Sequence, residues 1–389
     1  MEKIVLALLG AKGDCVYGTT LAHQIRRDYP NCHLVWAISS ACRDVVRNNP
    51  HINEVWEIKA DAHVGTANNW GKLAEELKNL TARGHIHKAI LAQIFPDNFQ
   101  NYDGTIRPSI FRAYNRPITV PIQGVVILDE EEKEAVRSFV TQHGLDTYPH
   151  RILFECTGKS MQSTMTVEQA VLVAESVSNE RDDCCFIIST DAEVASSRSN
   201  IVSARSVTYR ENLELIRYCN LFVGCGSGIT ALVSTCVKDF STPCIQSLAM
   251  GTSVYASFAH DFAYWNLDAS PFFEMRDPNV NELATAILAF LDGNRAEAER
   301  LRRTDKGGFF DLYIKAITER LLNEGRVLDA AYSLSHTVKR YGWHVELMEI
   351  ARFVIDNLEY DQHLTKVIHA AFIRDFCKSF TQNLRNMKK

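Results

Sequence analysis

Short, continuous apolar runs that alternate with helix-like segments constrain the fold of this chain more than any other feature. The first run, Ile4–Gly10, has no polar residue at alternate positions, which is typical of a strand buried on both faces of a parallel sheet. Similar runs follow at 33–39, 55–59 and 87–95, with helical periodicity between them. The alternation predicts βαβ units, and therefore a Rossmann-like domain in the first third of the chain.

The alternation stops near Pro117 and Pro121 and then restarts. Residues 129–144 begin with a run of acidic side chains and end at a glycine, which predicts a helix. New apolar runs predict four more strands, at 151–156, 184–190, 221–226 and 243–248. Helical segments separate these runs as well, so the second half of the chain predicts a second parallel sheet.

Two α/β halves in succession predict two Rossmann-like domains that face each other across a cleft. We place them at residues 1–122 and 123–292. From residue 279 onward only helical patterns occur, and we assign 293–389 to an all-helical extension. The last helix, predicted at 362–386, has basic residues on one side and phenylalanines mostly on the other. This pattern favours packing on the extension over contact with an anionic membrane surface.

Composition excludes several classes of protein. The net charge of −5 provides no basic field for nucleic acid, and no apolar run approaches the ~20 residues of a membrane span. The 11 cysteines are scattered, without a C-x-x-C pair or a metal-like Cys/His spacing. Such a pattern indicates reduced thiols in a cytoplasmic protein rather than a disulfide framework.

A glycine-rich stretch, Gly10–Thr20, follows the first strand and contains Lys12 and Asp14. It is not a dinucleotide fingerprint, because its glycines are wrongly spaced and the second strand ends in serine rather than an acid. A second candidate, Gly158–Ser160, lacks the glycine that a Walker motif places five residues before its second glycine. From the residues alone, Asp14 is either a helix cap or a general base.

The order of the motifs resembles that of the lipopolysaccharide heptosyltransferases and related inverting glycosyltransferases. The matching pieces are Gly13-Asp14, Tyr29-Pro30, Asn49-Pro50, Ile52-Asn53-Glu54-Val55 and the segment NLFVGCGSGITALVST at 220–235. The resemblance covers roughly residues 3–290 and implies the GT-B architecture, in which the second of two facing Rossmann-like domains binds most of the donor. Where the family carries Asp-Thr-Gly-x-x-His, this chain has Gly226-Ser227-Gly228-Ile229-Thr230-Ala231, so the donor sugar need not be a heptose.

The resemblance implies a role for each candidate residue. Asp14 matches the catalytic base that takes the proton of the acceptor hydroxyl, and Lys12 and Gly13 would meet the acceptor. A helix N-terminus, hydroxyls and a lysine would hold the donor diphosphate, through Lys159, Ser160, Gly226, Ser227, Gly228 and Thr230. Thr190 and Tyr209 would contact the nucleotide base or ribose, and His260 and Asp261 form a weaker acid–base candidate. A solvent-exposed Lys159, a packed Tyr209 and a structural His260 stay open as alternatives.

The predicted function is inverting, metal-independent transfer of a sugar from a nucleotide-diphosphate donor to a saccharide or glycolipid hydroxyl. The expected location is the cytoplasm or the inner face of the membrane. Neither a metal nor a cofactor is expected, because the chain has no Asp-x-Asp pair to hold a divalent cation against the diphosphate. The alternatives are a GT-B-type sugar-nucleotide epimerase and a non-catalytic sugar-nucleotide-binding or scaffold protein. Membrane contact of the last helix, homo-oligomerisation and the identities of donor and acceptor stay open.

Overall fold

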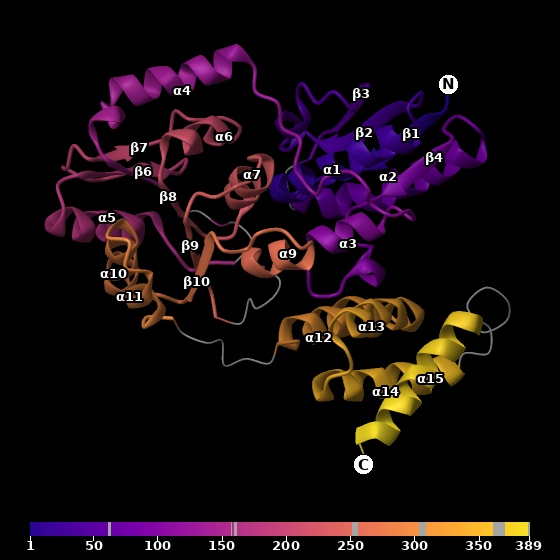
Figure 1. Ribbon diagram of the computed structural model, residues 1–389. Helices are drawn as coiled ribbons and strands as arrows, with labels where there is room; N and C mark the ends of the chain where they lie inside the picture. Colours follow the sequence, from indigo (N-terminus) through magenta and orange to yellow (C-terminus); the bar gives the residue numbers. More distant parts are fainter. Residues whose placement is uncertain are drawn as a thin grey trace.

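Two parallel sheets, each flanked by helices, form the two α/β parts of the molecule (Figure 1). The computed structural model describes residues 1–60, 64–156, 158, 162–250, 256–302, 309–360 and 370–387. Within these residues the first sheet has the strand order β3-β2-β1-β4 and the second has the order β10-β9-β8-β5-β6-β7. All the paired strands are parallel, and the second order is that of a doubly wound Rossmann sheet. The predicted pair of Rossmann-like domains is therefore confirmed.

The first domain is organised around β1, which lies between β2 and β4. Its elements are β1 (Lys3–Ala7), α1 (Lys12–Asp28), β2 (His33–Ser39), the 3-10 turn η1 (Arg43–Val46), β3 (Glu54–Ile58), α2 (Val64–Ala82), β4 (Lys88–Leu91), η2 (Phe99–Asn101) and α3 (Arg107–Arg112). Alternate residues of the first strand face opposite layers: Leu6 belongs to the apolar cluster that includes α1, whereas Val5 packs with Trp70 of α2. Burial on both faces explains why this strand is apolar without interruption.

The second domain follows a linker that runs along α1. Its elements are α4 (Glu130–Gln142), η3 (Leu145–Thr147), β5 (His150–Glu155), α5 (Val167–Glu180), β6 (Cys184–Ser189), β7 (Ile201–Ser203), α6 (Asn212–Leu215), η4 (Ile216–Tyr218), β8 (Leu221–Gly224), α7 (Gly228–Cys236), β9 (Cys244–Leu248), α9 (Phe258–Tyr264), β10 (Phe272–Arg276), α10 (Val280–Leu291) and α11 (Arg295–Glu299). The predicted acidic-first helix is α4, where Asp129 and Glu132 accept from each other's backbone N–H at 2.9 Å in a capping box. β7, α9 and β10 were not predicted.

The helical extension contains α12 (Asp311–Ile317), the π-helical turn η5 (Thr318–Leu322), α13 (Val327–Tyr341), α14 (Val345–Tyr360) and α15 (Ala370–Met387). α11 lies in the apolar cluster of the second domain, so the helices that stand apart begin with α12 rather than at residue 293. In α15, Phe376 and Phe380 pack against Trp343 with ring centroids 5.9 and 5.5 Å apart. The aromatic side of the last helix therefore packs on the extension, as its sequence favoured.

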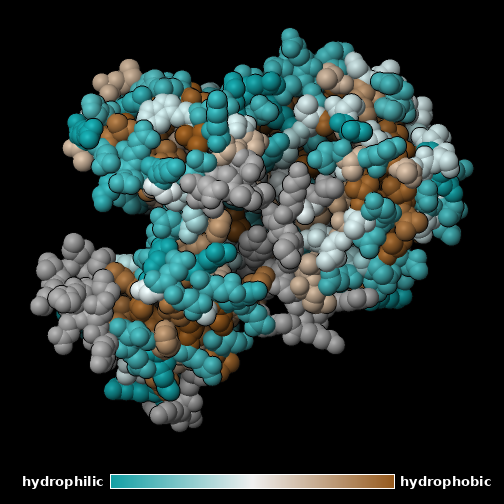
Figure 2. All heavy atoms as spheres, turned by 180° about the vertical axis from the view of Figure 1, so that it is seen from behind, coloured by the Kyte–Doolittle hydropathy of each residue, from teal (hydrophilic) through white to brown (hydrophobic). Residues whose placement is uncertain are grey.

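The extension forms a lobe of its own below the two domains, and apolar side chains gather on part of its surface when the molecule is seen from behind (Figure 2). Val345 and Phe353 of α14 are among its exposed apolar residues. None of the described helices combines the length and the apolar character needed to cross a bilayer.

Most of the glycine-rich stretch after β1 is helical. α1 begins at Lys12, so Lys12, Gly13 and Asp14 form its first turn and Gly18 lies farther along the same helix. The glycines at positions 13 and 18 obscure the N-terminus of this helix in the sequence, because glycine is a poor helix former. Close packing explains why glycine is used at position 18.

We expect Gly18→Ala to lower the free energy of unfolding by about 1–3 kcal/mol, because overpacking a filled core forces neighbours to move. An added Cβ would lie 2.5 Å from Leu8 Cδ2 and 2.8 Å from Trp36 Cη2, and both residues are fully buried. Urea denaturation measures the difference. Gly71→Ala in α2 is the matched control, since its Cβ would meet nothing within 4 Å. Equal stability of the two variants would contradict the packing argument.

Candidate functional site

The first turns of α1 and α7 meet at the junction of the two domains. In each sheet the strand order reverses beside a central strand, between β1 and β4 and between β5 and β8, and ligands bind at such points outside the carboxyl ends of the strands. α1 follows β1, and α7 follows β8. A Cβ added to Gly13 would lie 3.4 Å from the Cα of Gly228. The two glycine-bearing turns therefore lie close together at the point where the sequence predicted two domains facing each other across a cleft.

A cavity of about 480 Å³ lies beside this contact, between the domains. Its lining residues are Lys12, Asp44, Arg47, Asp129, Glu131, Glu132, Ala135, Thr208, Tyr209, Arg210 and Glu211. Lys12 Nζ lies 4.7 Å from the centroid of the Tyr209 ring, and the Tyr209 hydroxyl donates to the carbonyl of Gly228 at 2.8 Å. The structure thus brings together two of the predicted ligand-binding residues, one from each domain, at the first turn of α7.

Asp14 contributes to the cap of α1, which is one of the two roles that its sequence position allowed. Its Oδ2 accepts a hydrogen bond from the N–H of Ala11 at 3.2 Å, so the carboxylate caps the start of α1. The side chain is only partly exposed, and burial raises its pKa to about 7, although the hydrogen bond from Ala11 acts in the opposite direction. A carboxylate whose pKa lies near neutral pH is suited to general base catalysis.

The N-terminus of α7 already holds an anion from within the protein. Glu155, the last residue of β5, is 1% exposed. Its Oε1 accepts from the Ser227 hydroxyl and from the N–H of Ile229 at 3.1 Å. Its Oε2 accepts from the Thr230 hydroxyl at 2.5 Å and from the N–H of Cys225 at 3.3 Å. An internal carboxylate therefore accepts from two of the three hydroxyls that were predicted to hold the donor diphosphate.

Glu155 was not singled out from the sequence. The available signal was a lone acid at the carboxyl end of the otherwise apolar run RILFEC. A buried carboxylate needs several donors, but the sequence does not indicate that α7, more than 70 residues later, supplies them. Gly226, in the same turn, has φ of 70°, and this left-handed conformation explains why it is glycine.

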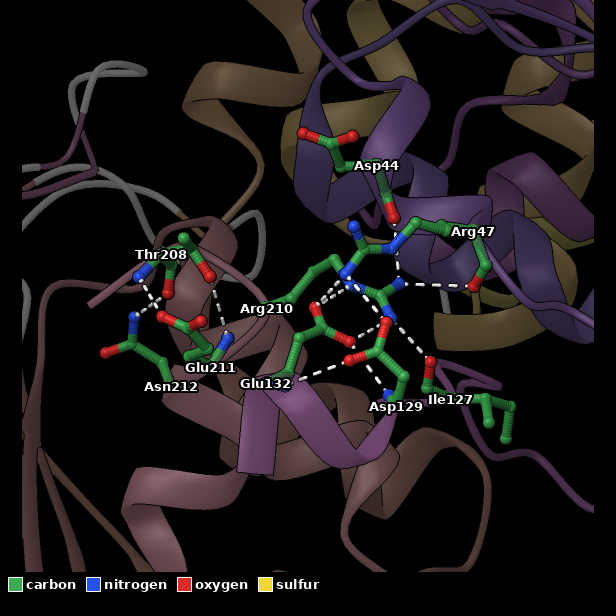
Figure 3. A network of polar contacts seen from close by, with 9 residues as sticks. All are labelled: Asp44, Arg47, Ile127, Asp129, Glu132, Thr208, Arg210, Glu211 and Asn212. Atoms are coloured by element: carbon green, nitrogen blue, oxygen red, sulfur yellow. Dashed lines mark hydrogen bonds and ion pairs between the residues drawn. The ribbon is translucent and has the colours of Figure 1, made fainter. Parts of the chain in front are cut away.

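Arg210 is the second important residue that sequence reasoning missed (Figure 3). Its guanidinium is 3% exposed and donates to Glu132 at 2.6 and 2.9 Å. It also donates to the backbone carbonyls of Asp44 and Arg47 in the first domain, at 2.8 and 3.2 Å. Burial would raise the pKa of Glu132, but the hydrogen-bonded Arg210 guanidinium holds it below its ordinary value. Arg210 thus joins the loop before α6 to η1 across the cavity.

His260 and Asp261 are adjacent in α9 but contact different neighbours. Asp261 forms an ion pair with the buried Arg107 of α3, and burial raises its pKa despite that partner. The Nε2 of His260 lies 2.9 Å from the hydroxyl of Tyr341 in α13. Each side chain therefore has a partner in another part of the protein, and this arrangement favours the structural alternative for His260.

The remaining candidates lie apart or outside the described residues. Lys159 and Ser160 belong to the latter group, so their predicted contact with a diphosphate stays a prediction. Thr190 follows β6, and its hydroxyl accepts from the N–H of Ala192 at 3.1 Å; it does not line the cavity. Among the described residues no group of three or more His, Cys, Asp or Glu side chains is arranged to hold a metal ion. Metal independence likewise stays a prediction.

Comparison with known proteins connects this arrangement to one fold. Neither a protein-family model nor a curated protein matches the chain. Among solved structures, it is similar to a glycosyl transferase of family 9 from Veillonella parvula, with 15% identity, coverage of 83% of this chain and 98% of that one, and a TM-score of 0.51. It is also similar to the ADP-heptose lps heptosyltransferase II of E. coli, with 14% identity, coverage of 77% and 100%, and a TM-score of 0.50.

A third similar structure belongs to a putative UDP-N-acetylglucosamine 2-epimerase from Listeria monocytogenes. It has 10% identity, coverage of 82% of this chain and 96% of that one, and a TM-score of 0.50. Similarity at this level of identity shows the fold alone. The chain has the GT-B fold that the sequence resemblance implied, followed by a helical extension.

Proposed function

We propose that this chain transfers a sugar from a nucleotide-diphosphate donor to a saccharide or glycolipid hydroxyl, with inversion and without a metal. One observation carries the proposal. Asp14, with a pKa near 7, stands in the first turn of α1, where that turn meets α7 of the second domain. A base at the meeting point of two Rossmann-like domains is positioned to serve an acceptor on one domain and a donor on the other. The GT-B fold is consistent with this division.

In the proposed reaction, the ionised Asp14 takes the proton of the acceptor hydroxyl as its oxygen attacks the anomeric carbon. Attack on the face opposite the leaving group inverts the configuration, and the nucleoside diphosphate departs. The resemblance assigned Lys12 to the acceptor, but its ammonium lies beside Tyr209 of the second domain. Lys12 would therefore stabilise the negative charge that develops on the phosphates, together with Lys159 and Ser160. Because Glu155 occupies the Ser227 and Thr230 hydroxyls, the diphosphate would rely on backbone N–H groups of the Gly226–Gly228 turn.

The proposal requires the two first turns to separate. Gly13 and Gly228 lie so close that a Cβ on either would be in van der Waals contact with the other, and a sugar bound between Asp14 and α7 needs that space. Opening and closing of GT-B domains around substrates would then exclude water during transfer.

A panel of sugar nucleotides carrying UDP, GDP, ADP, CMP or dTDP tests the donor half of the proposal by thermal unfolding. A ligand at 100 times its Kd should add about 2.7 kcal/mol of stability. Lys12→Met should weaken the stabilisation by the matching donor. Lys59→Met, which removes an exposed lysine after β3, should not. If no member of the panel stabilises the protein, the proposed function is wrong.

A non-catalytic sugar-nucleotide-binding protein is the second candidate. Two observations favour this candidate: the Glu155 carboxylate already binds the N-terminus of α7, and Gly13 lies against Gly228. Stabilisation by one donor without transfer, hydrolysis or epimerisation over many acceptors would support this candidate against the transferase. Analysis of the sugar products distinguishes transfer from epimerisation.

A further inference from the structure

Helix α9 of the second domain lies between the first domain and the helical extension (Figure 1). On one side its Asp261 is paired with Arg107 of α3. The hydroxyl of Tyr264 in α9 also accepts a hydrogen bond from Arg112 of α3 at 2.7 Å. On the other side Arg340 of α13 stacks over the Tyr264 ring, with the guanidinium 3.9 Å from the ring centroid. Three parts of the chain therefore meet on one short helix.

Helix α13 contacts both domains. Near its start, Arg326 donates to the carbonyl of Asp97 in the first domain at 2.7 Å. In its middle, the Ser333 hydroxyl donates to the carbonyl of Tyr102 at 2.5 Å. At its end, Arg340 and Tyr341 contact α9 of the second domain. A single rigid helix thus connects the segment around η2 to α9.

We infer that the helical extension is a brace that holds the two Rossmann-like domains together through α13. Separation of the domains moves the η2 segment away from α9, so α13 must release one of its two ends. The energy of opening then includes the weaker of the two attachments, in addition to the direct contacts made by Arg210 and by the Arg107–Asp261 pair. This role does not depend on which reaction, if any, the protein catalyses.

The first turns of α1 and α7 report domain separation directly. The N–H groups in the first turn of a helix have no acceptor within the helix. In α7 the N–H of Ile229 donates to Glu155, and the neighbouring Gly228 lies against Gly13 of α1. Their hydrogen exchange should therefore follow opening of the domains, while exchange in β6 follows unfolding of the second domain. Hydrogen exchange by mass spectrometry on peptides covering 12–17, 227–231 and 184–189 measures both processes.

Two double variants each release one end of the brace. Arg326→Gln with Ser333→Ala weakens the first-domain end, and Arg340→Gln with Tyr341→Phe weakens the second-domain end. Each lost contact changes an equilibrium by about threefold, so each double variant weakens its end of the brace about tenfold. With two ends of similar strength, either double variant should raise first-turn exchange about fivefold. Because release of either end is enough for opening, the two routes add, and all four substitutions together should give about tenfold. Independent stabilising contacts would instead give the product, about a hundredfold.

Arg352→Gln is the matched control, since it removes an exposed arginine from α14 within the same extension, and it should leave first-turn exchange unchanged. Protection of α14 in the same data set shows whether the extension stays folded. If a variant unfolds the extension, first-turn exchange should still rise, because the brace is lost. Unchanged first-turn exchange in both double variants, or a multiplicative effect when they are combined, would overturn the inference.

Discussion

Replacement of Asp14 by asparagine should reduce sugar transfer by a factor of about 10²–10⁴ while the fold and donor binding are retained. A positioned general base contributes a factor of this size, and asparagine cannot accept the proton. The Oδ1 of asparagine can still accept from the N–H of Ala11, so the cap at the start of α1 is preserved. The kcat for transfer and donor-induced thermal stabilisation measure the two effects separately.

Asp44→Asn is the matched control, because Asp44 is an aspartate of the same domain whose side chain is exposed. It should transfer sugar at close to the normal rate. Near-normal turnover by Asp14→Asn, or an equal loss in both variants, would remove Asp14 from the mechanism.

If Asp14 is the base, the activity and the stability of the native protein should both depend on pH near neutrality. Burial raises the pKa of Asp14 from its ordinary value of 3.8 to about 7, and only the ionised carboxylate can act as a base. The kcat/KM of the native protein should therefore fall about tenfold per unit below pH 7 and level off above it. The group binds a proton more tightly in the folded state, so its contribution to stability is complete below pH 3.8 and is lost as pH rises through 7. Asp14→Asn avoids that loss and should be at least as stable as the native protein at pH 8.

Much of the fold could be predicted because strands buried on both faces leave a strong signal in the sequence. β1, β2, β5 and β6 are continuous apolar runs, and each lies where its run predicts. The strand β7 spans only Ile201–Ser203, too short for a pattern to emerge. The strand β10 carries Glu274 and Arg276 among its five residues, which interrupts the apolar run. Local sequence thus predicts the central strands and fails for the short or polar ones.

Residues of the candidate site could be predicted only where they belong to a short local sequence motif. Asp14 and the turn Gly226–Gly228 belong to local motifs, and their juxtaposition follows from the GT-B arrangement. Glu155 and Arg210 act through partners that are distant in the sequence, including α7 for Glu155 and η1 for Arg210. Their importance comes from burial of a charge in tertiary structure, which no local pattern encodes.

Loss of the internal carboxylate should destabilise the protein strongly: Glu155→Ala is expected to lower the free energy of unfolding by about 3–5 kcal/mol. A buried donor that loses its acceptor costs about 1–3 kcal/mol, and a loss of this size follows when several donors stay buried and unsatisfied. The substitution leaves two hydroxyls and two backbone N–H groups without their acceptor. It also removes the negative charge that opposes the positive end of the α7 dipole. Urea denaturation measures the loss.

Two further variants separate charge from side-chain volume. Glu155→Gln keeps the shape and one acceptor oxygen, so it should lose about 1–3 kcal/mol, less than alanine. Glu193→Gln, an exposed glutamate after β6, should change stability by less than about 0.5 kcal/mol. If Glu155→Ala is as stable as Glu193→Gln, the four donors find other acceptors at no cost. The α7 turn would then be free to hold a ligand's phosphate by the route that its sequence suggested, and the case for a self-occupied, non-catalytic turn would fail.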